Sequence, residues 1–344
     1  MNLLITGGAG FIGSNFVYYL LKKNESIHII NLDKLTYAGN VDNLKAIRSH
    51  PRHTFLEGDI CNSKLLEDIF QQYRIDGVIH FAAESHVDNS IKNPNAFVET
   101  NVLGTFTLLE TARKFWMNEV NSYKKGFEHA RFHHVSTDEV YGTLGEEGYF
   151  TESTPYAPNS PYSATKAASD LFVRCYFYTY GLNIVTTNCS NNYGPRQHGE
   201  KLIPTIIRKA LSLEKIPIYG NGKNIRDWLY VDDHCRALEK VFFEGKSGET
   251  YVIGGHNEKT NLEIAQIISD ILDRIMPITD NHKGISSYHQ LIEFVQDRPG
   301  HDYRYAIDDS KFRNELGLTN EINFEEGIEK TILYYKDKYK KMLV

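Results

Sequence analysis

The segment Gly7-Gly8-Ala9-Gly10-Phe11-Ile12-Gly13 decides the fold of this chain. It follows a short apolar run at residues 3–6 and precedes a helical pattern over residues 14–22. The segment fits G-x-G-x-x-G from Gly8 and G-x-x-G-x-x-G from Gly7. Glycines at this spacing permit a tight turn and let the backbone approach a pyrophosphate at the helix N-terminus. The context therefore predicts a strand, turn and helix that bind a dinucleotide.

Short apolar runs alternate with longer helical patterns through the first half of the chain. Strands are predicted at residues 27–32, 53–57, 77–82, 131–136 and 184–188, and helices at residues 63–73, 95–115 and 161–180. Strands that alternate with helices pair in parallel through crossover connections. This order predicts an α/β fold with a doubly wound parallel sheet of the Rossmann type.

The alternation becomes irregular after Cys189, where Gly, Pro and Asn gather in residues 191–195. We therefore expect an NAD-binding domain over residues 1–190 and a smaller α/β substrate domain over residues 191–344. A strand-like run at residues 249–253 predicts that the chain rejoins the first domain, over about residues 228–256.

Composition excludes several classes of function. The 344 residues are 41% hydrophobic and 24% charged, with a formal net charge of −6, so the chain has no general attraction for nucleic acid or anionic membrane. No apolar run reaches transmembrane length, and no secretion signal opens the chain. The four cysteines show no metal-binding spacing, which predicts reduced thiols in a cytoplasmic protein without a metal site.

Asp33 indicates which dinucleotide binds. It ends the second predicted strand, where a carboxylate accepts hydrogen bonds from ribose hydroxyls and repels a 2′-phosphate, so we expect NAD rather than NADP. The neighbouring Lys34 weakens this preference. The predicted cofactor-binding residues are Gly7, Gly10, Phe11, Ile12, Gly13, Asp33, Lys34, Thr36, Asp59, Ile60, Phe81, Ala82, Ala83, Ser85, Thr100, Tyr162, Lys166 and Asn192.

Tyr162 and Lys166 form a Y-x-x-x-K pair at the start of the helix predicted over residues 161–180. Ser160 can cap that helix and Pro161 can be its first residue. The spacing puts the phenol and the ammonium on one helix face. A free phenol has a pKa of about 10, and a nearby ammonium and a positive nicotinamide ring both favour its phenolate. Tyr162 is therefore a candidate base.

Thr137, Asp138 and Glu139 follow the strand predicted at residues 131–136. Open α/β sheets bind ligands at the carboxyl ends of their strands, so these side chains are placed for catalysis. Thr137 can bond a reacting hydroxyl. Asp138 and Glu139 supply an acid and a base beyond what hydride transfer requires.

The chain resembles the dTDP-glucose 4,6-dehydratases over nearly its whole length. The matching stretches are A-A-E-S-H-V-D from Ala82, S-T-D-E-V-Y-G from Ser136, S-P-Y-S-A-T-K from Ser160, N-N-Y-G-P from Asn191, E-K-L-I-P from Glu200, R-D-W-L-Y-V-D-D-H from Arg226 and D-R-P-G-H-D from Asp297. The resemblance implies that Tyr162 takes the proton of the sugar 4-hydroxyl while hydride passes to NAD. Glu139 then removes the proton on carbon 5, Asp138 protonates the departing 6-hydroxyl, and the hydride returns to carbon 6.

The same resemblance implies a nucleotide-sugar substrate, held mainly by the second domain. Its predicted contacts are Ser85, Thr137, Asn191, Lys201, Leu202, Pro217, Tyr219, Arg226, Asn261, Arg298 and His301. It also implies a homodimer in which the helices near residues 95–115 and 161–180 pair across a two-fold axis, with apolar side chains such as Phe172, Phe177 and Tyr178. An apolar pattern that only covers the sheet is the alternative.

Other readings stay open at this point. A nucleotide-sugar 4-epimerase shares the fold, NAD and the Tyr-Lys pair, but Asp138 and Glu139 argue against it. A 4,6-dehydratase of UDP-glucose, or of GDP-mannose, is a second alternative, because the sequence discriminates poorly between bases. A non-catalytic Rossmann sensor has no need of Tyr162 or Lys166. His133 and His134 lie within a strand and are interpreted as packing residues.

Overall fold

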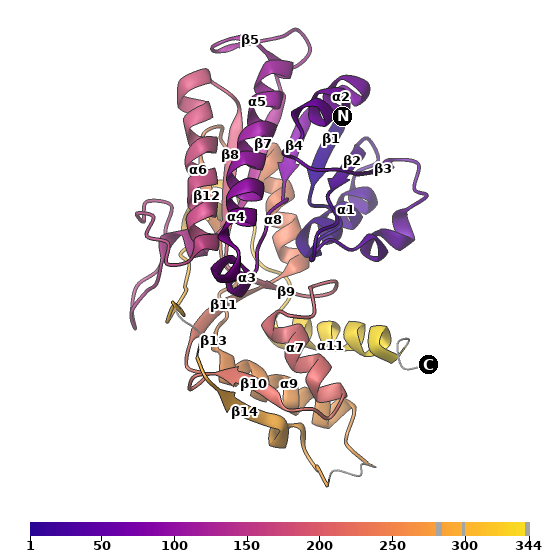
Figure 1. The fold of residues 1–344 in the computed structure, drawn as a ribbon, viewed down its shortest axis with the longest axis vertical. Coiled ribbons are helices and arrows are strands. Elements are labelled where there is room, and N and C mark those ends of the chain that lie inside the picture. Colours follow the sequence, from indigo (N-terminus) through magenta and orange to yellow (C-terminus); the bar gives the residue numbers. More distant parts are fainter. Residues whose placement is uncertain (280–283, 298–299, 341–344) are drawn as a thin grey trace.

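A seven-stranded sheet forms the centre of the computed structural model, which describes residues 1–279, 284–297 and 300–340 (Figure 1). Its strands lie in the order β12-β8-β7-β4-β1-β2-β3, and neighbours are parallel throughout. The bounds are β1 Asn2–Thr6, β2 His28–Asp33, β3 His53–Glu57, β4 Gly77–His80, β7 Arg131–Thr137, β8 Ile184–Cys189 and β12 Thr250–Ile253. The predicted doubly wound sheet is thereby confirmed.

Helices cover both faces of this sheet because each face is apolar. On one face α2 (Ser63–Tyr73), α5 (Thr105–Trp116) and α6 (Pro161–Tyr180) contribute Leu66, Leu108 and Val173 to a buried cluster. On the other face α1 (Phe11–Lys23) and α8 (Val231–Glu244) contribute Phe16 and Leu238 to a second cluster. The strand expected at residues 249–253 is β12, which pairs with β8, so the chain does return to the large sheet.

Two boundaries differ from the sequence-based expectation. Helix α1 begins at Phe11, three residues earlier than predicted, because the glycine turn leads directly into the helix. The single helix predicted over residues 95–115 is instead α4 (Pro94–Phe97), a π-helical segment (Val98–Gly104) and α5. Within the π segment the Asn101 amide bonds both backbone groups of Glu84 and the hydroxyl of Thr165. A wide turn of this kind is frequent at functional sites.

The smaller part of the molecule lies below the large sheet in Figure 1. Its strands are β9 (Asn191–Tyr193), β11 (Ile225–Tyr230) and β13 (Glu258–Thr260) in one sheet and β10 (Ile216–Tyr219) and β14 (Ile292–Val295) in another. Helices α7 (Leu202–Leu211), α9 (Asn261–Ile275) and α11 (Phe324–Lys340) share a separate buried cluster with them. Helix α10 (Ser310–Leu316) packs instead against β8 and β12. The remaining elements are α3 Val87–Lys92, the hairpin of β5 Met117–Glu119 and β6 Ser122–Tyr123, and the short helical turns Val41–Ile47, Asp138–Tyr141 and Tyr288–Leu291.

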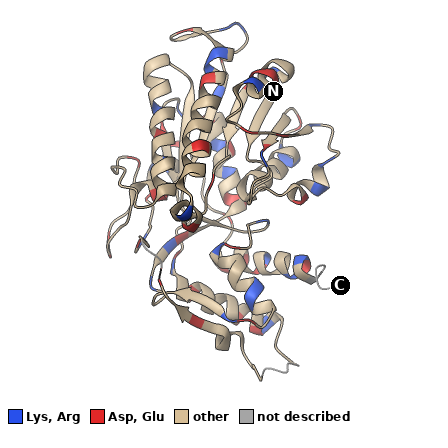
Figure 2. Cartoon of the chain, viewed as in Figure 1, with Lys and Arg blue, Asp and Glu red and all other residues tan. Residues whose placement is uncertain are grey.

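Charged residues are dispersed over the described chain. Figure 2 shows acidic and basic residues interspersed over both parts, without a continuous basic tract on the described residues in that view. Among the helices that the structure describes, none is long and apolar enough to cross a membrane. Over the same residues no group of His, Cys, Asp and Glu side chains is arranged to hold a metal ion. All four cysteines are free thiols.

Candidate active site

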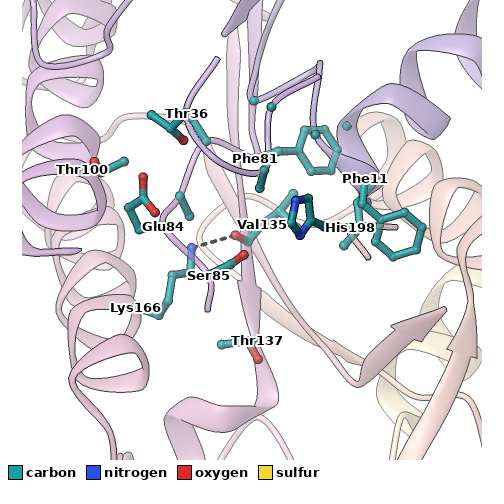
Figure 3. A pocket seen from close by; sticks show the side chains of 18 of the residues that line it. Phe11, Thr36, Phe81, Glu84, Ser85, Thr100, Val135, Thr137, Lys166 and His198 are labelled. Atoms are coloured by element: carbon teal, nitrogen blue, oxygen red, sulfur yellow. Dashed lines mark hydrogen bonds between the residues drawn. The ribbon is translucent and has the colours of Figure 1, made fainter. Parts of the chain in front are cut away.

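One pocket lies at the carboxyl ends of β1, β2, β4, β7 and β8, where parallel sheets bind ligands. Every residue predicted to bind the cofactor lines it, from Gly7 at the end of β1 to Asn192 on β9. The predicted catalytic residues line the same pocket. Figure 3 shows side chains from distant parts of the chain, including Phe11, Ser85, Thr137, Lys166 and His198, gathered around this space.

The glycine turn is closely packed and leaves space only at the start of α1. A Cβ atom on Gly7 would lie 2.6 Å from the Ala82 nitrogen, and one on Gly13 would lie 2.3 Å from the Gly7 oxygen, so side chains are excluded by packing. A Cβ atom on Gly10 would meet only the Gly7 oxygen, at 3.2 Å, so its absence leaves room beside the helix end. Among the described residues no side chain caps α1, which leaves N–H groups of its first turn for a ligand.

Asp33 and Lys34 have separate partners. The Asp33 carboxylate accepts bonds from the backbone N–H groups of Ala9, at 2.9 Å, and Leu35, at 2.8 Å. Burial raises the pKa of Asp33, while these backbone bonds oppose the increase. Lys34 Nζ lies 2.7 Å from Asp59 Oδ2, and this pairing raises the pKa of Lys34. Lys34 is thus paired with Asp59.

Helix α6 carries the Tyr-Lys pair, and its start is set as the sequence predicts. The Ser160 side chain accepts a bond from the Ser163 N–H group, in a capping box, and Pro161 is the first helical residue. Tyr162 and Lys166 are both buried on the face that lines the pocket. Lys166 Nζ donates to the Val135 carbonyl at 2.9 Å, the bond drawn in Figure 3.

Burial raises the pKa of Tyr162 well above its ordinary value, and the charge of Glu139 adds to the increase. The lowering expected from Lys166 is therefore not the dominant influence on Tyr162. A phenolate at this position needs positive charge from the ligands as well as from the lysine.

Thr137, Asp138 and Glu139 occupy the end of β7 and the turn that follows it. The Thr137 hydroxyl donates to Asp138 Oδ1 and accepts from the Glu139 N–H group, each at 3.3 Å. Asp138 is 1% exposed, and its second oxygen has no hydrogen-bond partner within the described part of the chain. Burial raises the pKa of Asp138 well above its ordinary value, and the charges of Glu139 and Asp227 add to this. Asp138 is thus suited to be a protonated acid.

The predicted substrate contacts divide into two groups. Ser85, Thr137, Asn191 and Lys201 line the pocket, whereas Leu202, Pro217, Tyr219, Arg226, Asn261 and His301 do not, and Arg298 lies outside the described residues. Tyr219 and His301 lie together on the smaller part, with ring centroids 6.3 Å apart. The Arg226 guanidinium donates to the backbone carbonyls of Ile225, at 2.7 Å, and Asp302, at 2.9 Å, and stacks on Tyr305.

Several pocket residues were not predicted from the sequence. Tyr37 and His198 meet edge to face, with ring centroids 5.7 Å apart, and the Tyr37 hydroxyl lies 3.3 Å from Ser85 Oγ. Glu84 and Glu200 also line the pocket. Glu84 lies in the stretch A-A-E-S-H-V-D and Glu200 in the stretch E-K-L-I-P, so the resemblance to the family could have indicated both residues. Tyr37 and His198 lie in loops that carry no such signal.

The glycine turn on β1 meets the Tyr-Lys pair of α6 in one pocket above a parallel sheet, an arrangement that defines the extended short-chain dehydrogenases/reductases. A sequence model of the GDP-mannose 4,6 dehydratase family matches residues 4–331. The dTDP-glucose 4,6-dehydratase of Neisseria gonorrhoeae is 53% identical over 337 residues, which are 98% of this chain and 96% of that protein. Within that family, this chain belongs to the dTDP-glucose 4,6-dehydratases.

Solved structures agree with this placement. The dTDP-glucose 4,6-dehydratase of Bacillus anthracis, crystallised with NAD, matches with a TM-score of 0.86 and 44% identity, over 100% of both chains. The UDP-glucose 4-epimerase of Thermotoga maritima matches with a TM-score of 0.85 but only 27% identity, over 98% of this chain and 100% of that one. The fold is therefore common to dehydratases and epimerases, and the sequence separates them.

Proposed function

We propose that this chain is an NAD-dependent dTDP-glucose 4,6-dehydratase that forms dTDP-4-keto-6-deoxyglucose and water. The observation that carries the proposal is the pairing of two kinds of chemistry in one pocket. Tyr162 and Lys166 suit oxidation at carbon 4, and the buried Asp138 beside Glu139 suits the removal of water. The identity to dehydratases of that name supports the choice of substrate.

Oxidation at carbon 4 is assigned to the residues of α6 and β7. Tyr162 takes the proton of the 4-hydroxyl at its phenol oxygen, and Thr137 holds that hydroxyl in place. Lys166 supplies positive charge to the phenolate from its anchored position on Val135. NAD, when bound, supplies the acceptor for the hydride of carbon 4 and later its donor to carbon 6.

The elimination of water is assigned to the acidic pair. A 4-keto group acidifies the neighbouring proton on carbon 5, which Glu139 removes. Asp138, kept protonated by burial, gives its proton to the departing 6-hydroxyl. A site closed to water protects the unsaturated intermediate until carbon 6 is reduced. A 4-epimerase does not need this acid and base, which is why we prefer the dehydratase to that alternative.

Purified protein incubated with dTDP-glucose should give a 4-keto product, detected by its absorbance in alkali. UDP-glucose in a parallel incubation tests the thymine preference, which rests on identity to relatives. A product lacking the 4-keto group, or epimerised sugar alone, would contradict the proposal.

Cofactor choice follows from Asp33. We expect NAD to bind more than about tenfold more tightly than NADP, since tenfold corresponds to about 1.4 kcal/mol and like charges in contact cost on the order of several kcal/mol. Lys34→Ala should leave this ratio nearly unchanged, because Asp59 already pairs with the lysine. Titration of the purified protein with each cofactor measures the ratio. Equal affinities would overturn the role given to Asp33.

The helices beside the pocket support a homodimer. Exposed apolar side chains gather on α6, where Leu171 is 56% and Tyr178 65% exposed, and on the π segment and α5, where Leu103 and Phe106 are exposed. The ring centroids of Phe106 on α5 and Phe172 on α6 lie 6.0 Å apart, so the exposed apolar side chains of the two helices form one patch. The third aromatic residue named from the sequence, Phe177, packs against the core instead. A patch of this kind suits pairing with a second copy.

Light scattering at micromolar concentration should therefore show a dimer. Leu171→Glu should give a monomer, because it places a charge in the patch. Leu333→Glu is the matched control, since Leu333 is exposed on α11, away from the patch. A wild-type monomer would contradict the dimer, and the helices would then serve only to cover the sheet.

Two broader assignments complete the proposal. Residues 1–190, with about 228–256, form the NAD-binding domain, and the rest of 191–344 forms the nucleotide-sugar-binding domain; the separate cluster of α7, α9 and α11 supports this division, while α10 packs against β8 and β12. We also propose a cytoplasmic location, in keeping with the free thiols.

A further inference from the structure

A buried polar cluster lies beside Lys166. Its members are His134 on β7 and Asp170 on α6, both fully or almost fully buried. Asp170 follows Lys166 by four residues, as Lys166 follows Tyr162, so the three side chains share one face of α6. The proposed mechanism assigns no task to Asp170 or His134.

Asp170 is held as a carboxylate. Its oxygens accept bonds from His134 Nε2, the Tyr156 hydroxyl and the Asn188 amide, each at 3.0 Å. Burial raises the pKa of Asp170, but the bond from His134 and the positive charge of Lys166 oppose it, so that the pKa lies below its ordinary value. A carboxylate with several donors stays ionised even inside a protein. A buried anion therefore lies one helical turn beyond Lys166.

His134 is neutral, donates to Asp170 and lies beside Lys166. Burial and the charge of Lys166 lower its pKa to about 4. Its Nε2 atom lies 3.0 Å from Asp170 Oδ1 and 3.5 Å from Lys166 Nζ, while its Nδ1 atom has no partner within the described residues. The Asp170 carboxylate accepts a hydrogen bond from His134 Nε2–H, and the neutral ring adds no second positive charge.

The charge of Asp170 acts on Lys166. Burial lowers the pKa of Lys166, and the charge of Asp170 is the leading influence in the opposite direction. The other titratable groups around the pair are His80 on β4, Cys189 on β8, Tyr141 and Tyr156 beyond β7, and Tyr162 on α6, with Glu139 acting on Tyr162. His80 is bonded at both ring nitrogens by threonine hydroxyls, and burial keeps it neutral.

We infer that Asp170 is a positioning residue for the oxidation step: its buried carboxylate, oriented by His134 and Tyr156, keeps Lys166 protonated beside Tyr162. This inference rests on the proposed function, because it concerns the same Tyr-Lys pair. The inference extends the site by one further turn of α6, to the Asp170 carboxylate. This carboxylate acts through Lys166 and is not assigned a contact with substrate or cofactor.

Asp170→Asn removes the anion at nearly constant volume. Loss of the anion lowers the pKa of Lys166, and a neutral lysine then raises the pKa of Tyr162. Oxidation requires a tyrosinate at Tyr162 and an ammonium at Lys166. The pH below which oxidation slows should therefore rise with the pKa of Tyr162, and the pH above which it slows should fall with the pKa of Lys166. Each shift should be about one pH unit, the lower end of what an opposite charge nearby produces.

The readout is the pH dependence of enzyme-bound NADH formation in single turnovers of the Glu139→Gln enzyme with dTDP-glucose, because that background does not complete the reaction. A second readout does not need turnover: the ultraviolet difference spectrum between the NAD-bound enzyme and its Tyr162→Phe variant titrates the Tyr162 phenol. Asp170→Asn should raise that titration midpoint by about one unit. Asp170→Glu, which retains the charge, should restore part of the shift.

Two further variants separate this role from packing. Tyr156→Phe removes one hydrogen-bond donor from Asp170 without changing any charge. It should raise the titration midpoint of the Tyr162 phenol, as Asp170→Asn does, but by less. This variant keeps the test possible if Asp170→Asn fails to fold. Asp233→Asn is the matched control, since Asp233 is a buried carboxylate of α8 that bonds backbone N–H groups of Glu321 and Ile322. It should lower the melting temperature and leave the titration unchanged.

The outcomes distinguish the inference from the proposed function. A phenol titration that is the same in the parent, Asp170→Asn and Tyr156→Phe enzymes overturns the inference, whatever the turnover. Absence of bound NADH in the Glu139→Gln parent overturns the proposed function, while a shifted phenol titration in that case still supports the link from Asp170 to Tyr162.

Discussion

The Glu139→Gln enzyme is expected to accumulate bound NADH when it is mixed with dTDP-glucose and to form almost no 4-keto-6-deoxy product. Glu139 is the base assigned to the proton on carbon 5, whereas the residues assigned to oxidation, Tyr162 and Lys166, are unchanged. Removal of a general base costs about a hundredfold to ten-thousandfold in rate. Absorbance of the reduced nicotinamide, followed in stopped flow beside product assays, measures both effects.

Two comparisons sharpen this experiment. Tyr162→Phe should give neither bound NADH nor product, because the 4-hydroxyl then has no base. Glu146→Gln is the matched control, since Glu146 is an exposed carboxylate of the loop that follows the acidic pair, and it should turn over normally. If Glu139→Gln turned over at the normal rate, Asp138 and Glu139 would be only an acidic turn and an epimerase would become the better reading.

The residues on the cofactor side of the pocket could be predicted from the sequence because they lie at or near the ends of strands. Gly7 follows β1 directly, Asp33 ends β2 and Asp59 comes two residues after β3, and parallel strands bring such positions to one edge of the sheet. Local rules fixed the start of α6 as well, through Ser160 and Pro161. These features need only short stretches of sequence and the general geometry of a parallel sheet.

Features that depend on contacts between distant segments could not be read in this way. The π segment exists where the Asn101 amide bridges Glu84 and Thr165, which lie far away in the chain. His134 was correctly predicted to be buried, but its bond to Asp170 depends on how β7 packs against α6. The resemblance implied a substrate contact for Arg226, and only the structure shows its guanidinium bonded to backbone carbonyls.

Asp138→Asn should slow the elimination by about a hundredfold to ten-thousandfold and, like Glu139→Gln, prolong the lifetime of bound NADH. The two variants should differ in their response to pH. Burial and the charges of Glu139 and Asp227 raise the pKa of Asp138, so the acid form persists where an ordinary aspartic acid is ionised. Since the proton must be present to be donated, the decay of bound NADH in the wild-type enzyme should slow as pH rises through that raised pKa.

In Asp138→Asn the same decay should be slow at every pH and show no such alkaline limit, because the amide has no proton to lose. The Glu139→Gln enzyme retains Asp138, so its residual decay should still slow at high pH. Stopped-flow records of NADH decay across the pH range, with dTDP-glucose in excess, compare the three enzymes directly. An alkaline limit that survived unchanged in Asp138→Asn would assign it to another group, and Asp138 would no longer be the acid that releases water.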